Sequence, residues 1–498
     1  HWLRKFVDIP ESTKELADML TMLGFEAEIP ESNWDNKNIV SARVLECIPH
    51  PNADKLKLCQ LDDGKGEKQV VCGAPNVSAG QKVAFARLGT KFLDGFKIKK
   101  VKIRGTDSEG MICSEKELGI SDEHEGIMIL DTNVNPGLQL SKCISPFLQA
   151  LELDITPNRP DSMSHLGIAR EIAAKCDRKL KSISFNETKS KSDYTINITL
   201  KNKKGCPRYI AGIMNNIKMG KSPPWMADSL NSAGMRPINL LVDISNYVLL
   251  EMGHPTHIFD LKYFSDNNVT VRNANPGEKI TVLDGQECKL INDHLLITNG
   301  KDPVALAGIM GGKKSAVSYE TQSILVESAY FDPITIRKGA KYLGMSTESS
   351  KRFERGADPN ACVTAFWRIV DLVKELCGGE LVSDMTDAYP KKIVQPEIQL
   401  DSRRVYQLSG IEIPNEFTKT TLSKLGVKIK SNGKDKWKCL PPSFRPDLTR
   451  EIDLIEEIIR IYGYENVFSE TSFSGLLNVD VQDPYHDIHN IQIFLKGL

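Results

Sequence analysis

Hydrophobic positions change their spacing along the chain, and each change predicts a different kind of element. Between Thr13 and Leu23 apolar residues recur at helical spacing, and the run ends at Gly24, which predicts a helix. From Ile39 onward the apolar runs become short and β-rich, as in KLKLCQL and QKVAFARLG, and Pro, Asn, Asp and Gly separate them. Several closely spaced short strands within about a hundred residues predict a small β-barrel.

The remainder of the chain mixes helical and strand patterns between two polar connectors. Ser164 is placed to cap a helix, and the connectors RKLKSISFNETKSKSD and YPKKIVQP flank a long mixed region. A compact last segment closes on the helix DLTREIDLIEEIIRIYGY. The pattern predicts an α+β protein of several domains. The predicted domains are 1–38 continued at 149–190, then 39–148, 194–386, 397–469 and 470–498.

Composition narrows the class of protein without naming it. A 40% hydrophobic and 26% charged chain with a net charge of −1 is typical of globular protein and excludes a chain that binds polyanions over its whole surface. Eleven cysteines without a CxxC pair favour a reduced, cytoplasmic location over disulfides or structural zinc. We expect no membrane span and no signal peptide. The start at His1 and the helix-like end suggest a C-terminally truncated fragment.

A local basic patch lies in the predicted barrel. Between Lys55 and Arg104 there are twelve Lys and Arg but only four Asp and Glu. Strand alternation without a bulge would place Lys100, Lys102 and Arg104 on one side, where they could neutralise phosphates. An edge strand protected by lysines gives the same pattern.

The segment RPINLLVDISNYVLLEMGHPTHIFD combines an apolar helix pattern with a polar face. Asn239, Asp243 and Asn246 lie at i, i+4 and i+7, and Gly253 ends the helix. The polar face would line a cavity or form a satisfied network in the core. Pro255 fixes the backbone before His257, whose imidazole could be neutral and orient a water or a ribose hydroxyl. A single histidine can also be structural, and we expect its neighbour His254 to be exposed.

Acidic residues gather on the last predicted helix. Asp453, Glu456 and Glu457 share one face, and Asp447 could cap the helix. Carboxylate oxygens suit Mg²⁺. A cap beside a solvated acidic face explains the pattern equally.

Several ordered motifs resemble a known family. HPNADKLKLCQLDDG, VVCGAPNV and IRGTDSEGMICSEKELGI are similar to the tRNA-binding oligonucleotide-fold (OB-fold) module. The remaining motifs, which include the segment above, ALAGIMGG, ESAYFDP, STESSKRFERGADP and RPDLTREIDLIEEIIRIYGYENV, resemble the β subunit of bacterial phenylalanine–tRNA ligase. The resemblance covers essentially the whole chain.

The resemblance implies an editing domain at 194–386 that hydrolyses tyrosine wrongly attached to tRNA(Phe). Hydrophobic pockets reject an added hydroxyl poorly, so a second site is needed. Glu327 would accept a hydrogen bond from the tyrosine hydroxyl and thereby exclude phenylalanine. The other implied site residues are Arg236, Asn246, Pro255 and His257 around the ester, Gly308 and Gly311 at the backbone approach, and Thr347 and Ser349 in the pocket wall. With no Ser-His-Asp or Cys-His set evident, we expect water-mediated hydrolysis.

The resemblance also implies partners and cofactors. An α subunit would bind ATP and phenylalanine and complete an α₂β₂ tetramer, so we expect no ATP on this chain. Mg²⁺ would be shared with that subunit through Asp447, Asp453, Glu456 and Glu457. Residues 397–469 would form a small B5-type, winged-helix-like domain, and 470–498 would begin a catalytic-like domain. The alternatives are a non-catalytic tRNA-binding scaffold and a free-standing editing factor.

Overall fold

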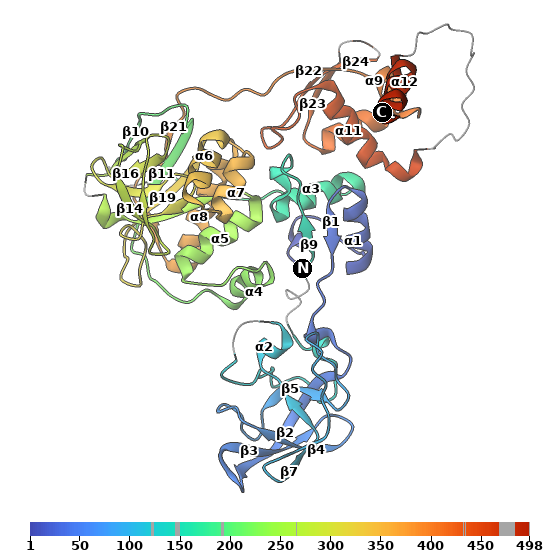
Figure 1. Cartoon of the computed structure of the whole chain (residues 1–498). Coiled ribbons are helices and arrows are strands. Elements are labelled where there is room, and N and C mark those ends of the chain that lie inside the picture. Colours follow the sequence, from blue (N-terminus) through green and yellow to red (C-terminus); the bar gives the residue numbers. More distant parts are fainter. Residues whose placement is uncertain are drawn as a thin grey trace.

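The computed structural model describes residues 1–120, 124–144, 150–190, 194–264, 266–431, 433, 435–467 and 484–497. Figure 1 shows a barrel-like module in blue and cyan, a mixed α/β body in green to light orange, and a smaller module in orange and red. The N-terminal segment lies between them, beside the helix that follows the barrel-like module. None of the described helices has the length and apolar character that crossing a membrane requires.

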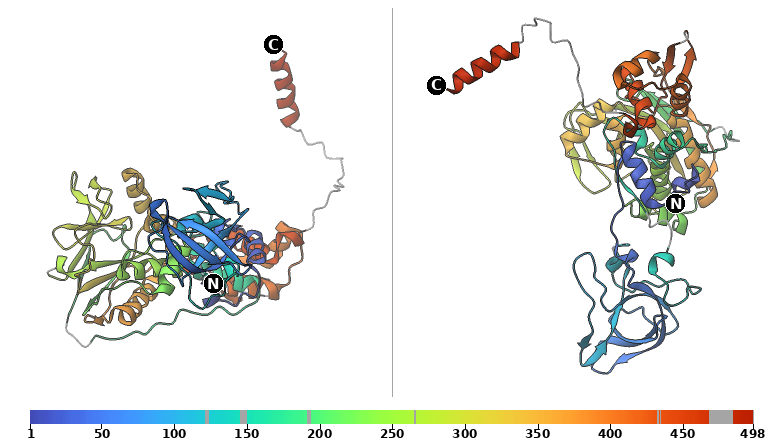
Figure 2. Two further views of the ribbon diagram at one scale, coloured as in Figure 1. Left: turned by 90° about the horizontal axis from the view of Figure 1, so that it is seen from below. Right: turned by 90° about the vertical axis from the view of Figure 1, so that its right-hand side faces the viewer.

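The barrel-like module is a five-stranded antiparallel sheet in the order β4-β3-β2-β5-β8. Its ends approach each other, because Glu109 N donates to Gln69 O at 2.8 Å, and the right-hand view of Figure 2 shows the strands curving into a ring. The sheet is therefore nearly closed. Its elements are β2 (Ile39–His50), β3 (Ala53–Asp62), β4 (Glu67–Cys72), β5 (Lys82–Arg87), the hairpin β6 (Val101–Ile103) and β7 (Thr106–Ser108), then β8 (Gly110–Ile112) and α2 (Glu115–Leu118).

The N-terminal segment leaves for the barrel-like module and is rejoined after it. Helix α1 (Thr13–Met22) ends before Gly24, as its sequence predicts. It begins with a capping box between Ser12 and Glu15. Strand β1 (Glu26–Glu28) pairs antiparallel with β9 (Glu152–Asp154), which follows the barrel-like module. Helix α3 (His165–Lys175) then starts at Ser164, whose side chain accepts from Gly167 N.

The mixed body contains two five-membered sheets. The first sheet has the order β12-β19-β11-β20, with β21 also paired to β11, and the second has the order β10-β13-β16-β17-β18. The strands of the first sheet are β11 (Arg208–Asn215), β12 (Thr256–Asp260), β19 (Ile324–Tyr330), β20 (Glu380–Leu381) and β21 (Thr386–Ala388). Those of the second are β10 (Asn197–Leu200), β13 (Asn268–Asn273), β16 (Leu295–Thr298), β17 (Pro303–Leu306) and β18 (Met310–Gly311), with the hairpin β14 (Lys279–Thr281) and β15 (Glu287–Lys289) beside it.

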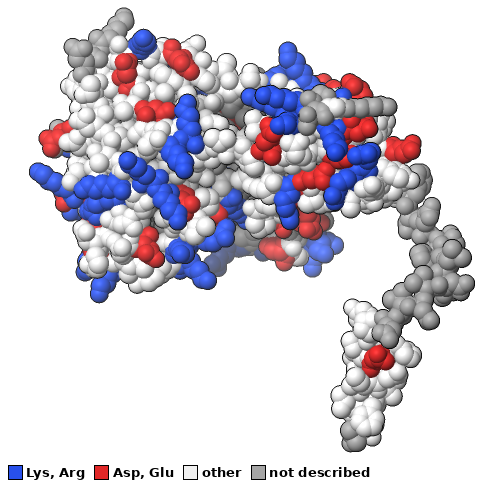
Figure 3. Space-filling view, turned by 90° about the horizontal axis from the view of Figure 1, so that it is seen from above, with Lys and Arg blue, Asp and Glu red and all other residues white. Residues whose placement is uncertain are grey.

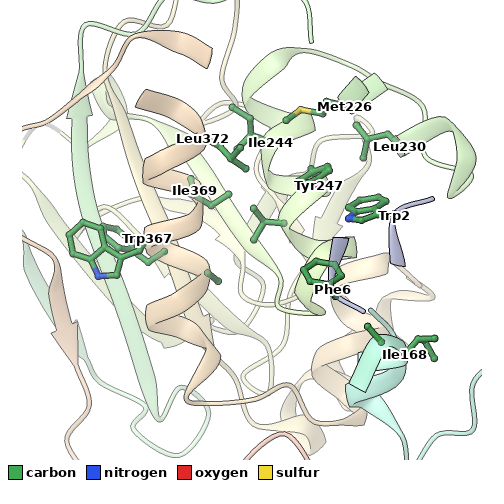
Figure 4. Close-up of a cluster of buried hydrophobic side chains, with 14 of the residues drawn as sticks. Trp2, Phe6, Ile168, Met226, Leu230, Ile244, Tyr247, Trp367, Ile369 and Leu372 are labelled. Carbon is green, nitrogen blue, oxygen red and sulfur yellow. The ribbon is translucent and has the colours of Figure 1, made fainter. Parts of the chain in front are cut away.

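The first sheet is covered on both faces, and this explains its apolar strands. Ile210, Ile258 and Val326 face a cluster that includes helices and the N-terminal segment, where Trp2, Tyr247 and Trp367 lie (Figure 4). Alternate residues such as Tyr209 and Leu325 face the second sheet. The helices of this body are α4 (Pro224–Ser232), α5 (Leu240–Met252), α6 (Pro333–Leu343), α7 (Glu348–Arg355) and α8 (Ala361–Cys377).

The small C-terminal module packs helices on a three-stranded sheet in the order β22-β24-β23. Its elements are β22 (Ile398–Asp401), α9 (Ser402–Ser409), α10 (Asn415–Lys424), β23 (Lys428–Ser431), β24 (Lys436–Leu440) and α11 (Glu451–Tyr462). Within the predicted segment 470–498, residues 470–483 and 498 lie outside the described residues, and the rest carries α12 (Pro484–Lys496).

Candidate functional site

Two predicted site residues, His257 and Glu327, lie opposite each other on neighbouring strands. They are register partners where β12 pairs antiparallel with β19. Directly opposite residues project from the same face of a sheet, and here that face turns toward the second sheet. Leu325 and Ala329, two positions either side of Glu327, belong to the apolar cluster on that face. Fold and register thus place an imidazole and a carboxyl group together in an apolar setting.

The Glu327 carboxyl has two different oxygens. Oε2 accepts a 2.8 Å hydrogen bond from the hydroxyl of Tyr209 on β11. No described residue donates a hydrogen bond to Oε1. Some of the polar atoms in the described residues are fully buried without a partner, but Oε1 does not belong to that group. Burial raises the pKa of Glu327 to about 7, against the opposing effect of the Tyr209 hydrogen bond. The group is therefore poised between its neutral and charged forms near neutral pH.

His257 is held as a neutral imidazole. Burial lowers its pKa to about 4, and its ring packs edge-on against Phe259 with the centroids 4.4 Å apart. A Cβ added to Gly311 would lie 2.5 Å from Cε1 of His257. Only glycine lets β18 approach the ring this closely, so Gly311 joins the site through a steric requirement.

The loop before β18 is hydrogen-bonded to residues at the start of α7. Thr347 Oγ1 donates to Ile309 O at 2.8 Å, and Ser349 Oγ donates to Gly308 O at 3.3 Å. Gly308 has a φ of +67°, and an added Cβ would lie 2.9 Å from the side chains of Ile336 and Phe331. The structure therefore links His257, Glu327, Gly308, Gly311, Thr347 and Ser349 through a continuous series of contacts.

Three other predicted site residues have different surroundings. Pro255 is buried immediately before β12. Arg236 is exposed ahead of α5, Asn246 is half-buried on α5, and no hydrogen bond or ion pair within the described ranges joins either one to His257 or Glu327. Their roles stay predictions.

The polar face of α5 mainly serves local structure. Asn239 caps the helix by accepting from Val242 N, and Asp243 accepts from Ser222 Oγ and Ile238 N. For Asn239 and Asp243 the satisfied-network interpretation is correct. The expectation that His254 is exposed is wrong: the residue is 1% exposed. Two contacts enclose it. The end of α5 packs against Ser164, whose Cβ would lie 3.1 Å from a Cβ added to Gly253, and the ring of His254 packs edge-on against Phe353.

The predicted magnesium ligands do not assemble into a cation site within this chain. In the described part of the chain, no group of three or more His, Cys, Asp or Glu residues is placed to hold a metal ion. Arg445 pairs with both Asp447 and Glu457, at 2.7 and 2.9 Å. Asp453 accepts from the backbone of Thr449 and Arg450 at the start of α11. Asp447, Asp453 and Glu457 thus have internal partners, whereas Glu456 is exposed on α11. An ion shared with a second subunit stays a prediction.

The basic residues of the barrel-like module do not share one strand face. Strand β6 is three residues long, and Arg104 lies in the turn after it with a φ of +48°. Lys100 pairs with Glu109 at 2.7 Å and with Asp107 at 3.5 Å, while Lys102 is exposed. The prediction that Lys100, Lys102 and Arg104 share one strand face is therefore wrong, because β6 ends before it reaches Arg104. Figure 3 shows the opposite side of the molecule, where basic and acidic side chains are interspersed over the mixed body and the small C-terminal module.

Tyr209, which the sequence does not identify as a site residue, is fully buried and donates a hydrogen bond to the carboxyl group of Glu327. It lies 118 positions before Glu327, in a strand without a polar pattern. The one available signal was that a tyrosine inside an apolar strand needs a hydrogen-bond partner for its hydroxyl. The sequence alone does not say which one.

Three family models match the chain in succession. They are described as "Putative tRNA binding domain" over residues 39–139, "B3/4 domain" over 205–378 and "tRNA synthetase B5 domain" over 398–464. These ranges fall on the barrel-like module, the mixed body with the candidate site, and the small C-terminal module.

Curated relatives match nearly all of the chain. The phenylalanine–tRNA ligase beta subunit of Geobacter metallireducens is 42% identical over 470 residues, 94% of this chain and 59% of that protein. The protein of the same name from Halalkalibacterium halodurans is 40% identical over 508 residues, 100% of this chain and 63% of that protein. The chain thus spans less than two thirds of these relatives. An N-terminal fragment of the phenylalanyl-tRNA synthetase beta-subunit from Pyrococcus horikoshii matches 63% of this chain and 87% of its own, at 16% identity and a TM-score of 0.34, too low to support an argument.

Proposed function

The chain belongs to the phenylalanine–tRNA ligase beta-subunit family, and from this premise we propose that it binds tRNA(Phe) and hydrolyses tyrosine wrongly attached to it. The observation that carries the proposal is the pair His257 and Glu327, opposite each other on β12 and β19. One oxygen of Glu327 is bonded and the other has no partner among the described residues. That open oxygen suits a phenol hydroxyl.

Selectivity follows from the cost of an unpaired buried carboxylate. The hydroxyl of a tyrosyl group would donate to Oε1 of Glu327, whereas a phenylalanyl ring would remove water from that oxygen and offer no donor. Leaving a buried charged group unpaired costs at least about 1–3 kcal/mol, roughly a ten- to hundredfold preference for tyrosine.

The hydrolytic step uses water as the nucleophile. Neutral His257 orients a water molecule whose oxygen forms a bond to the ester carbonyl carbon. The C–O bond to the ribose breaks and a proton of the water passes to the ribose oxygen, so tyrosine and tRNA(Phe) with a free hydroxyl leave. Gly308 and Gly311 let the backbone approach the substrate. Thr347 and Ser349 form the pocket wall. The residues around the ester and the terminal adenosine are Arg236, Asn246 and Pro255. The contacts that join His257, Gly311, Ile309 and Thr347 support this arrangement.

The finer domain assignments are part of the same proposal. The nearly closed sheet supports an OB-fold at 39–148, in which Lys100, Lys102 and Arg104 contact tRNA. We assign the editing domain to 194–386, a winged-helix-like module to 397–469 and the start of a catalytic-like domain to 470–498, with 149–190 continuing residues 1–38. In a cytoplasmic α₂β₂ complex, the α subunit would use ATP to charge tRNA(Phe), and Mg²⁺ would be held between the subunits.

The test supplies tRNA(Phe) carrying tyrosine to the purified chain and measures release of the amino acid. We expect release by the unmodified chain, little release from tRNA(Phe) carrying phenylalanine, and a loss of about a hundredfold in His257→Ala. Glu327→Ala should lose about ten- to hundredfold on the tyrosine ester. The matched controls His489→Ala and Glu320→Ala change exposed residues outside the site and should keep full activity.

The rival proposal is a tRNA-binding scaffold without catalysis. It predicts that the unmodified chain binds tRNA(Phe) and releases no tyrosine. The family match to a tRNA-binding domain supports binding under either proposal, so only the release measurement separates them. A free-standing editing factor would release tyrosine without any α subunit, in a gene that ends near residue 498.

A further inference from the structure

Tyr209 is bonded to the carboxyl group of Glu327 but has no role in the reaction proposed above. It lies on β11, two residues from Ala211, the register partner of Glu327 across β11 and β19. Tyr209 is itself the register partner of Ala329, two residues from Glu327, so its hydroxyl reaches the carboxyl of Glu327 diagonally across the two strands. The ring is fully buried and the hydroxyl–Oε2 distance is 2.8 Å.

We propose that Tyr209 is a positioning residue for the proposed editing reaction, which holds Oε2 of Glu327 and so presents Oε1 to the hydroxyl of a bound tyrosyl group. The inference rests on the proposed function. It adds a second determinant of selectivity: the chain's own phenol satisfies one carboxylate oxygen, and the substrate phenol must satisfy the other.

The chemistry of the carboxyl group gives this contact two effects. An ionised carboxylate is an acceptor only, whereas a protonated one carries an O–H donor. The Tyr209 hydroxyl donates a hydrogen bond to Oε2, so it stabilises the ionised form of Glu327 and fixes the rotation of its carboxylate. Burial acts in the opposite direction and raises the pKa of Glu327 to about 7, so this one donor affects the charged fraction at neutral pH.

Removing the phenol hydroxyl should therefore weaken selectivity as well as rate. In Tyr209→Phe, Glu327 keeps more of its proton, its carboxyl group rotates, and a phenylalanyl ring meets a neutral acid in place of an unpaired charge. Because neutral polar groups cost less to bury than charged ones, the discrimination between tyrosine and phenylalanine esters should narrow.

The experiment measures deacylation of both esters by the full chain between pH 6 and 9, after subtraction of the enzyme-free rate. Tyr209→Phe should lose about fivefold on the tyrosine ester at pH 7 and regain most of it near pH 9, with the rising limb displaced upward by about one pH unit. The matched control Tyr247→Phe removes the hydroxyl of another buried tyrosine, which accepts from Lys5 Nζ, and should leave the profile unchanged.

Two further measurements separate positioning from simple damage. In a Glu327→Gln background, where residue 327 cannot ionise, adding Tyr209→Phe should no longer displace the pH profile. Replacing Tyr209 by 3-fluorotyrosine, a stronger donor with an unchanged fold, should move the rising limb of the profile downward.

The outcomes are distinct. If the unmodified chain releases no tyrosine, the proposed function fails. If it is active, and neither Tyr209→Phe nor 3-fluorotyrosine moves the profile or the selectivity, the positioning role of Tyr209 is overturned while the proposed function stands.

Discussion

At the scale of single residues, Glu327 links the chemistry of the site to the stability of the fold. The residue is 5% exposed, and burial raises the pKa of its carboxyl group to about 7. A carboxyl group whose pKa is higher in the folded than in the unfolded chain binds its proton more tightly when folded. Its favourable contribution is complete below the unfolded pKa and is lost as the pH rises through the folded pKa.

Glu327→Gln should therefore change how stability depends on pH. The variant removes the cost of a buried charge. The free energy of unfolding of the variant, relative to that of the wild type, should therefore increase by about 3 kcal/mol as the pH rises from about 4 to 8. Urea denaturation of both proteins at several pH values measures the difference. Parallel curves for the two proteins would show that Glu327 titrates normally.

Gly311 is the second residue with a consequence that can be measured. An added Cβ would lie within 2.5 Å of the His257 ring, so Gly311→Ala must displace that ring. We expect a stability loss of about 1–3 kcal/mol from overpacking, together with loss of deacylation. Gly220→Ala is the matched control, because its added Cβ would have only Leu240 nearby, at 4.0 Å. Full activity in Gly311→Ala would remove His257 from the proposed mechanism.

At the scale of elements, local signals were readable from the sequence and long-range ones were not. Caps are local: the predicted start at Ser164 and the predicted stops at Gly24 and Gly253 are all present. The strand pairings that bring Tyr209, His257 and Glu327 together join segments far apart in the chain. Periodicity carries no information about such pairings.

The wrong element-scale predictions have the same origin. Alternation along the basic run assumed a strand that continues to Arg104, whereas the chain turns after Ile103. The acidic helix was interpreted without its partner Arg445, which lies before the helix and pairs with two of the four carboxylates. Family resemblance supplied the site residues because their roles depend on contacts that sequence spacing does not encode.

The hydroxyl of Thr347 caps the start of helix α7 and also links this helix to the candidate site. Thr347 Oγ1 accepts from Ser350 N at 3.0 Å and donates to Ile309 O at 2.8 Å. Thr347→Val keeps the shape and removes both bonds, which should cost about 2 kcal/mol. Thr347→Ser keeps the hydroxyl and should lose less than about half as much. Denaturation midpoints compare them, and equal losses would mean that the methyl group matters more than the hydroxyl.

At the scale of the whole molecule, buried ion pairs join the small C-terminal module to α3. Arg445 and Arg460 both pair with Glu457 in the small module, and Arg460 also lies 2.7 Å from Glu171 on α3. Glu171 in turn pairs with Arg159. Burial opposes ionisation of Glu457, but Arg445 and its neighbours outweigh that effect and keep the pKa of Glu457 below its ordinary value. The network thus orients α11 against α3, and Glu457, a predicted metal ligand, is part of this joint.

Arg445→Ala tests whether the network holds the two modules together. Removing the guanidinium leaves Asp447 and Glu457 without their shared partner, and breaking a buried pair from one side costs about 3–5 kcal/mol. Arg404→Ala is the control: its pair with Glu451, at 3.2 Å, is on the surface, and such pairs contribute about 0–1 kcal/mol. Thermal unfolding should therefore begin much earlier in Arg445→Ala than in Arg404→Ala, and amide exchange should rise along both α11 and α3. Because Glu457 is held ionised, the difference between the Arg445→Ala variant and the wild type should shrink as acid protonates that carboxyl group. If both variants unfold alike, or if exchange rises in α11 alone, the joint depends on apolar packing and the charges only accompany it.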